Sequence, residues 1–181
     1  MTTNSKPFDY LVRRLRLRHL ELLVALTECG TMRAAAGRLH LSQPAISKML
    51  LEVEEALGTL LFERSRQGVT PTAAGAAAVH RCRIVLSELA HARDEVDAMR
   101  SGASAVLRVG TFSVTAAVPA AVVQLRARIP GAAVHLHEGR VRELIQRLLE
   151  GKLDCVFGAL TTELLTSDLL RSLQSEVLLK D

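Results

Sequence analysis

The stretch LHLSQPAISKML, residues 39–50, decides the fold of the first part of the chain. Apolar residues return at helical spacing through Ile46 and Leu50, after a polar interruption that begins at Ser42. The Ser42 hydroxyl can cap a helix, because the first backbone N–H groups of a helix have no partner within it. Pro44 fits into that first turn, where a missing N–H costs little. The stretch therefore predicts the start of an amphipathic helix.

This helix is predicted to run over 42–57, to end at Gly58, and to bury Ile46, Leu50, Val53 and Leu57. A shorter helix over 32–40, with Thr31 as its cap and small residues facing inward, precedes it. Two helices joined by a tight turn form the helix-turn-helix pattern. Three polar residues lie off the apolar face at the start of the second helix: Gln43, Ser47 and Lys48.

In a helix-turn-helix the first residues of the second helix can reach base edges in the major groove. Glutamine can pair with adenine through two hydrogen bonds, and serine or lysine can contact bases or phosphates. The residues alone also allow a plain three-helix interaction bundle that binds no DNA. Two further elements flank the motif. The first is a helix over 17–29 with Leu17, Leu20, Val24 and Thr27 on one face and Leu23 beside them, and the second is a small hairpin around 64–68.

A long helix is predicted over 72–99, a segment without proline. Small and apolar residues recur there at alternating spacings of three and four, which is typical of helices that pair along their length. The alternative is an ordinary amphipathic helix packed on its own domain. The repeat consists of Gly75, Ala78, Cys82, Val85, Leu89, Ala92, Val96 and Met99, and we expect Cys82, Val85, Leu89, Ala92 and Val96 to form a dimer interface.

The sequence after the hinge SGAS at 101–104 alternates between strand and helix patterns. This order predicts a parallel sheet with crossover helices. A sheet that ended here would expose an unfinished edge, so we expect the sequence to be part of a longer protein. The predicted strands are 106–111, 132–138, 153–160 and 175–181, and the predicted helices are 119–129 and 141–150.

The composition indicates which partners and which cellular compartment suit the protein. Lys and Arg outnumber Asp and Glu by 23 to 19, which is compatible with a nucleic-acid partner. Three cysteines far apart, with no signal peptide and no apolar run of membrane-spanning length, predict a cytoplasmic protein that does not bind a membrane. An aromatic content of 3% disfavours the stacking surfaces that bind single strands or RNA.

No catalytic motif occurs, so we expect no enzyme activity and no cofactor. His135 and His137 share a strand face beside Glu138, but no third ligand follows at a plausible spacing, and we predict no metal site.

The motifs AAAGRLHLSQPAISKML, LEVEEALGTLLFER and TPTAAG, in this order and spacing, resemble the N-terminal domain of LysR-type transcriptional regulators. The long helix resembles that family's dimerising linker. The remainder resembles the first half of its effector domain, which is built like a periplasmic binding protein. The resemblance implies an α+β multidomain fold with a winged helix-turn-helix over 1–71, a linker helix over 72–101 and a partial α/β domain over 102–181.

The same resemblance implies roles for individual residues. Thr31 and Arg33 would lie near phosphates or a groove, and Arg64 and Arg66 would belong to a wing that contacts the minor groove or the backbone. Gln43, Pro44, Ser47 and Lys48 would form the reading face. In the loop GTFSVTAAVP, the hydroxyls of Thr111, Ser113 and Thr115 would contact part of a small-molecule effector, although helix capping explains them equally well.

We therefore expect a regulator that binds specific sequences in double-stranded DNA as a homodimer or homotetramer and, at full length, responds to a small-molecule effector. The alternative is a small-molecule-binding or enzymatic α/β protein whose N-terminal helices form only an interaction module.

Overall fold

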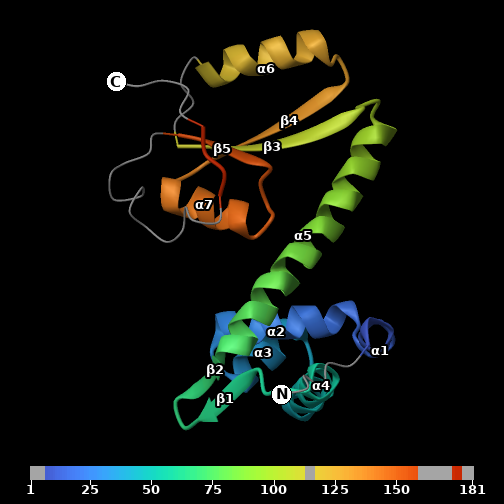
Figure 1. Ribbon diagram of the computed structural model, residues 1–181, viewed down its shortest axis with the longest axis vertical. Coiled ribbons are helices and arrows are strands. Elements are labelled where there is room, and N and C mark those ends of the chain that lie inside the picture. The colour runs from blue at the N-terminus through green and yellow to red at the C-terminus, as the bar shows by residue number, and fades with distance from the viewer. Residues whose placement is uncertain (1–6, 113–116, 159–172, 177–181) are drawn as a thin grey trace. The chain divides into compact units, whose positions relative to one another are not determined.

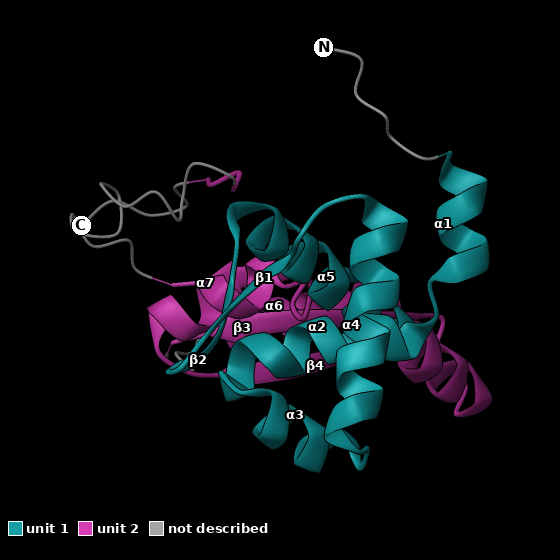
Figure 2. Ribbon diagram, turned by 90° about the horizontal axis from the view of Figure 1, so that it is seen from below, with its two compact units in different colours: residues 1–91 teal, residues 92–181 magenta. Residues whose placement is uncertain are grey.

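The computed structural model describes residues 7–112, 117–158 and 173–176. The chain forms two compact units, Met1–His91 and Ala92–Asp181, shown in different colours in Figure 2. The division falls inside one long helix, α5 (Ala73–Arg100), which matches the helix predicted over 72–99. Each unit has buried apolar residues of its own.

From residue 7 onward, the first unit forms four helices and a two-stranded hairpin ahead of α5 (Figure 1). All the elements predicted for this region are present, and one short helix, α1, was not predicted. The elements are α1 (Phe8–Arg14), α2 (Leu17–Cys29), α3 (Met32–Leu39), α4 (Gln43–Leu57), β1 (Phe62–Ser65) and β2 (Gly68–Pro71).

The predicted helix ends are confirmed by their hydrogen bonds. The Ser42 hydroxyl accepts from the backbone N–H of Ala45 at 3.3 Å, and Thr31 caps α3 by accepting from Ala34 at 3.1 Å. Gly30 and Gly58 follow α2 and α4 in the left-handed conformation, at φ 67° and 71°. These ends follow from local sequence, because each partner lies within four residues of the group it satisfies.

The buried face of α2 differs from the predicted one. Leu23 is buried, as expected, but Leu22 and Leu26 are buried with it, whereas Leu17 is 49% exposed and Leu20 is half-buried. The reason is that α2 contacts α3, α4 and β2, so neighbouring elements cover more than one side of it. In α4 the prediction holds for Ile46, Leu50 and Val53, which are buried, and fails for Leu57, which is exposed.

The hairpin is anchored to the helices at two points. The Glu54 carboxylate on α4 accepts from the backbone N–H groups of Leu61 and Phe62, at 2.8 and 3.2 Å. The backbone N–H of Val69 donates to the carbonyl of Gly30 at 2.7 Å. The strands therefore have a defined position against α2 and α4.

The described residues of the second unit form a three-stranded parallel sheet in the order β4-β3-β5. Figure 1 shows α6 on one face of this sheet and α7 on the other. This arrangement confirms the predicted alternation of strands and crossover helices. The elements are β3 (Ala105–Thr111), α6 (Ala117–Arg128), β4 (Ala132–Glu138), α7 (Val141–Leu149) and β5 (Cys155–Phe157).

Two details of the second unit depart from prediction. Helix α6 begins at Ala117, two residues earlier than predicted, and Pro119 lies in its first turn, where proline is tolerated. A fourth strand was predicted over 175–181. Residues 173–176 contain no regular secondary structure, and the rest of that stretch lies outside the described residues.

None of the helices in the described part of the chain is long and apolar enough to span a membrane. The same residues contain no group of three His, Cys, Asp or Glu side chains arranged to hold a metal ion.

Candidate nucleic-acid interface

The turn between α3 and α4 is short and fixed by backbone hydrogen bonds. His40 ends α3 in the left-handed conformation, at φ 54°, and its N–H donates to Gly37 at 3.3 Å. The N–H of Leu41 donates to the carbonyl of Ala36 at 2.9 Å. The turn leads directly to the Ser42 cap, so the start of α4 is held close to the end of α3.

The predicted reading face lies at the start of α4. Gln43, Pro44 and Lys48 are exposed, and Ser47 is half-buried. Nζ of Lys48 lies 4.0 Å from Oε1 of Glu52, one helical turn further along. An exposed pair at this distance is weak, so the ammonium group can turn toward a phosphate. The start of α4 is also the positive end of the helix dipole, which favours an anion nearby.

The other predicted DNA-binding residues lie on other elements of the first unit. Thr31 and Arg33 are exposed at the start of α3. Because the Thr31 oxygen accepts from Ala34, its hydroxyl hydrogen is left to donate. Arg64 is exposed on β1, and Arg66 is exposed in the hairpin turn. The eight predicted residues therefore come from two helix N-termini and one hairpin of the same compact unit.

Charged networks that the sequence reasoning did not identify support these elements. The Glu28 carboxylate on α2 accepts from Nη1 of Arg38 on α3 and, at 3.4 Å, from Nη2 of Arg83 on α5. Burial alone would raise the pKa of Glu28, but the hydrogen bonds and charges of Arg38 and Arg83 outweigh it, so the pKa is lowered. Three helices are thus joined at one carboxylate. No local spacing indicates this, because Arg83 is 55 residues from Glu28.

A second network joins α2 to α4, the helix that carries the predicted reading face and is called the reading helix below. Nε2 of the buried His19 lies 3.4 Å from Oε2 of Glu52, the same carboxylate that faces Lys48. The spacing of four residues from Lys48 to Glu52 was visible in the sequence; the approach of His19 was not.

The predicted dimer residues divide into two groups. Val85, Leu89, Ala92 and Val96 are exposed, with Val85, Leu89 and Val96 exposed by 47, 50 and 58%. Cys82 instead is half-buried against the core of the first unit, where burial raises the pKa of its thiol to about 11. Its contacts are thus within its own protomer, because the first turns of α5 pack on the helix-turn-helix unit.

Of the three predicted effector residues, Thr111 alone lies within the described residues. Thr111 is the last residue of β3, paired with Glu138 and Phe157 of the neighbouring strands, and is fully buried. The strand was predicted to reach Thr111, but the hydroxyl is not exposed to a ligand as expected, because the surrounding residues cover the whole side chain. Ser113 and Thr115 lie outside the described residues.

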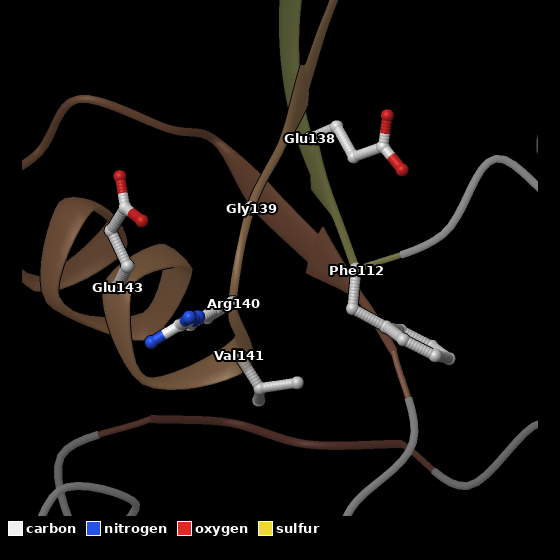
Figure 3. A pocket seen from close by; sticks show the side chains of 6 residues that line it. All are labelled: Phe112, Glu138, Gly139, Arg140, Val141 and Glu143. Carbon is white, nitrogen blue, oxygen red and sulfur yellow. The ribbon is translucent and has the colours of Figure 1, made fainter.

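An open hollow of about 650 Å³ lies at the C-terminal edge of the sheet, where open parallel sheets place ligands. In Figure 3 the charged groups of Arg140 and Glu143 lie to one side of Gly139, and that of Glu138 lies to the other. The described residues that line the hollow therefore do not direct a set of polar groups toward one point. The lining residues are Phe112, Glu138, Gly139, Arg140, Val141 and Glu143.

Comparison with known proteins gives matches over both units. The model of the bacterial regulatory helix-turn-helix protein, lysR family, matches residues 17–76. The model of the LysR substrate binding domain matches residues 100–180.

Individual relatives agree with these matches. The chain is 34% identical over 163 residues to the HTH-type transcriptional regulator GbpR of Azospirillum brasilense, which covers 88% of this chain and 48% of the relative. It is 34% identical over 151 residues to the DNA-binding transcriptional dual regulator OxyR of Escherichia coli, covering 82% of this chain and 50% of the relative. The chain therefore spans about half the length of these curated relatives.

A solved structure also matches. The crystal structure of CbnR, a LysR family transcriptional regulator, is 32% identical at a TM-score of 0.49, and covers 80% of this chain and 50% of that one.

Proposed function

The chain belongs to the LysR family of bacterial regulators, and from this we propose that it binds specific sequences in double-stranded DNA through α4 and the β1–β2 hairpin. The observation that carries the proposal is the exposed, polar start of α4. Gln43 and Lys48 are presented there on a helix whose opposite side is locked into the core by Ile46 and Leu50. A rigidly held helix with exposed polar side chains near its N-terminus suits the major groove.

Gln43 is proposed as the base-reading residue, and Pro44, Ser47 and Lys48 as its neighbours on the reading face. Glutamine can recognise adenine by two hydrogen bonds. Thr31, Arg33, Arg64 and Arg66 are proposed to contact phosphates or the minor groove, which orients the protein on the duplex without reading sequence.

Two protomers are proposed to pair along α5 through Val85, Leu89, Ala92 and Val96. These four side chains are exposed in the single chain, which gives a partner apolar surface to cover. A dimer, or a tetramer built from dimers, would set two reading helices in successive major grooves, about 34–36 Å apart.

The α/β unit is proposed to belong to a domain that binds a small-molecule effector in the full-length protein. Its hollow at the C-terminal edge of the sheet supports this role. An effector would act by binding more tightly to one of two arrangements of the protein. Because it acts on chromosomal DNA, the protein is proposed to work in the cytoplasm, as a regulator and not as an enzyme.

The test begins with duplexes recovered by selection from a random pool. Binding to a selected duplex is compared with binding to random duplex at several salt concentrations. Gln43→Ala should weaken binding to the selected duplex by about 1–3 kcal/mol and relax discrimination at one base pair. Arg66→Ala should weaken binding to all sequences similarly and reduce the salt dependence.

The rival function is an α/β protein whose N-terminal helices bind only another protein. A chain that shows no preference for any selected duplex, at any salt concentration, would favour that rival. Unaltered discrimination by Gln43→Ala would instead show that the reading face is assigned to the wrong residues.

A further inference from the structure

Helix α1 lies outside the part of the chain that matches the family. The match to the helix-turn-helix model begins at Leu17, and α1 covers Phe8–Arg14. It packs against α4, and Figure 2 shows the two helices side by side. The segment ahead of the matched residues is therefore held against α4.

This segment and the start of α2 together are strongly basic. Between Pro7 and Arg18 four arginines stand against a single acid, Asp9. All four are exposed, and none is paired with an acidic side chain in the part of the chain that the structure describes. The guanidinium of Arg14 lies 5.5 Å from the ring centroid of Tyr10, which restrains it without neutralising it. The basic patch consists of Arg13, Arg14, Arg16 and Arg18.

The basic patch is connected to the reading face by a chain of polar contacts. The backbone N–H of Arg16 donates to Nδ1 of His19 at 3.0 Å, so the other ring nitrogen, Nε2, faces Glu52 at 3.4 Å with its hydrogen. Glu52 in turn lies 4.0 Å from Lys48. The start of α2 is therefore fixed beside α4, one helical turn from a residue of the reading face.

We propose that the basic patch contacts phosphates of the DNA backbone beside the bases that α4 reads. Exposed, unpaired guanidinium groups suit this role, because phosphate neutralisation releases counterions and needs no particular base. The contacts lengthen the bound segment of duplex and raise affinity for every sequence. This inference rests on the proposed function, since it requires that α4 lies on DNA.

Phe8 and Val12 on α1 are also exposed, by 77 and 60%, which makes a second copy of the chain the competing occupant of this surface. The excess of positive charge favours DNA over a second copy, because two identical basic patches repel each other.

The test is the double variant Arg13→Gln/Arg14→Gln, measured on random-sequence duplex between 50 and 200 mM salt. Each lost phosphate contact makes the plot of log affinity against log salt concentration shallower by about 0.9. Because the variant loses two contacts, the affinity of the wild type should fall about twelve-fold more over this range than that of the variant. Arg13→Lys/Arg14→Lys keeps both charges and should keep the wild-type slope. Arg126→Gln/Arg128→Gln removes two exposed charges at the end of α6 and is the control for net charge alone.

The outcomes separate the two proposals. If the wild type binds random duplex but the Gln variant keeps its slope, or if the α6 control loses as much, the basic patch does not contact phosphates. A changed mass in solution, with an unchanged slope, would assign α1 to a second copy. A wild type that prefers no selected duplex at any salt concentration would instead overturn the proposed function itself, whatever the slopes of the variants. Circular dichroism and thermal melting of each variant verify that it is folded.

Discussion

At the scale of single residues, Glu54 joins α4 to the β1–β2 hairpin, which is the proposed wing. One oxygen of this buried carboxylate accepts from two backbone N–H groups, those of Leu61 and Phe62. Glu54→Ala leaves both donors buried without a partner, and should lower the free energy of unfolding by about 1–3 kcal/mol. Glu54→Gln keeps an acceptor oxygen and should lose less. Urea unfolding of the three proteins measures this, and equal losses for Ala and Gln would show that the charge matters more than the acceptor.

At the scale of elements, the β1–β2 hairpin packs against the turn that follows α2. Gly68 has φ 139°, and a Cβ atom there would lie 2.3 Å from the carbonyl oxygen of Gly30. Gly68→Ala should therefore destabilise the protein by more than about 1 kcal/mol and displace β2, which weakens binding through the wing. Gly37→Ala is the control, because a Cβ on this exposed residue of α3 meets nothing within 4 Å and should stabilise by up to about 1 kcal/mol. If thermal melting showed Gly37→Ala to be less stable than Gly68→Ala, the close contact between Gly68 and Gly30 would be refuted.

The junction of α2, α3 and α5 at Glu28 makes stability depend on pH. The pKa of Glu28 is lowered in the folded protein, so its ion pairs stabilise the fold above the ordinary value of 4.5 and are lost as the pH falls through the folded-state pKa. The carboxylate is 39% exposed, so solvent screening limits the effect to about 1 kcal/mol or less. Glu28→Gln should be less stable than wild type at pH 7 in urea, and the difference should shrink on going to acid. A difference that stayed constant with pH would point to lost packing.

At the scale of the whole molecule, the exposed apolar side chains of α5 predict assembly. Leu89 is 50% exposed in the single chain, so Leu89→Glu should leave the protomer folded while placing a charge in the paired interface. Sedimentation should then give the monomer mass for this variant and a dimer or larger for the wild type. Val123→Glu, at a more exposed apolar position on α6, is the control that should leave the mass unchanged. An unchanged mass for Leu89→Glu would remove the proposed pairing of α5.

Local sequence was sufficient for most of the elements and their ends, although it did not indicate α1. Ser42, Thr31, Gly30 and Gly58 act on groups within four residues, so α2, α3 and α4 were predicted with nearly their observed bounds. The strand and helix alternation likewise predicted a parallel sheet. The exposed residues of the reading face were predicted for the same reason: once three apolar positions of α4 are buried, helical geometry places Gln43 and Lys48 outside.

Tertiary structure decided which side of each element is covered and by what. The buried face of α2, the packing of Cys82 on its own protomer and the burial of Thr111 all depend on neighbours that are distant in sequence. The contacts of Glu28 with Arg83 and of His19 with Glu52 have the same origin. Hydrogen bonds within a turn link residues a few positions apart and can be predicted from their order. Packing and charge pairing link residues whose separation along the chain is arbitrary, and only the folded chain brings them together.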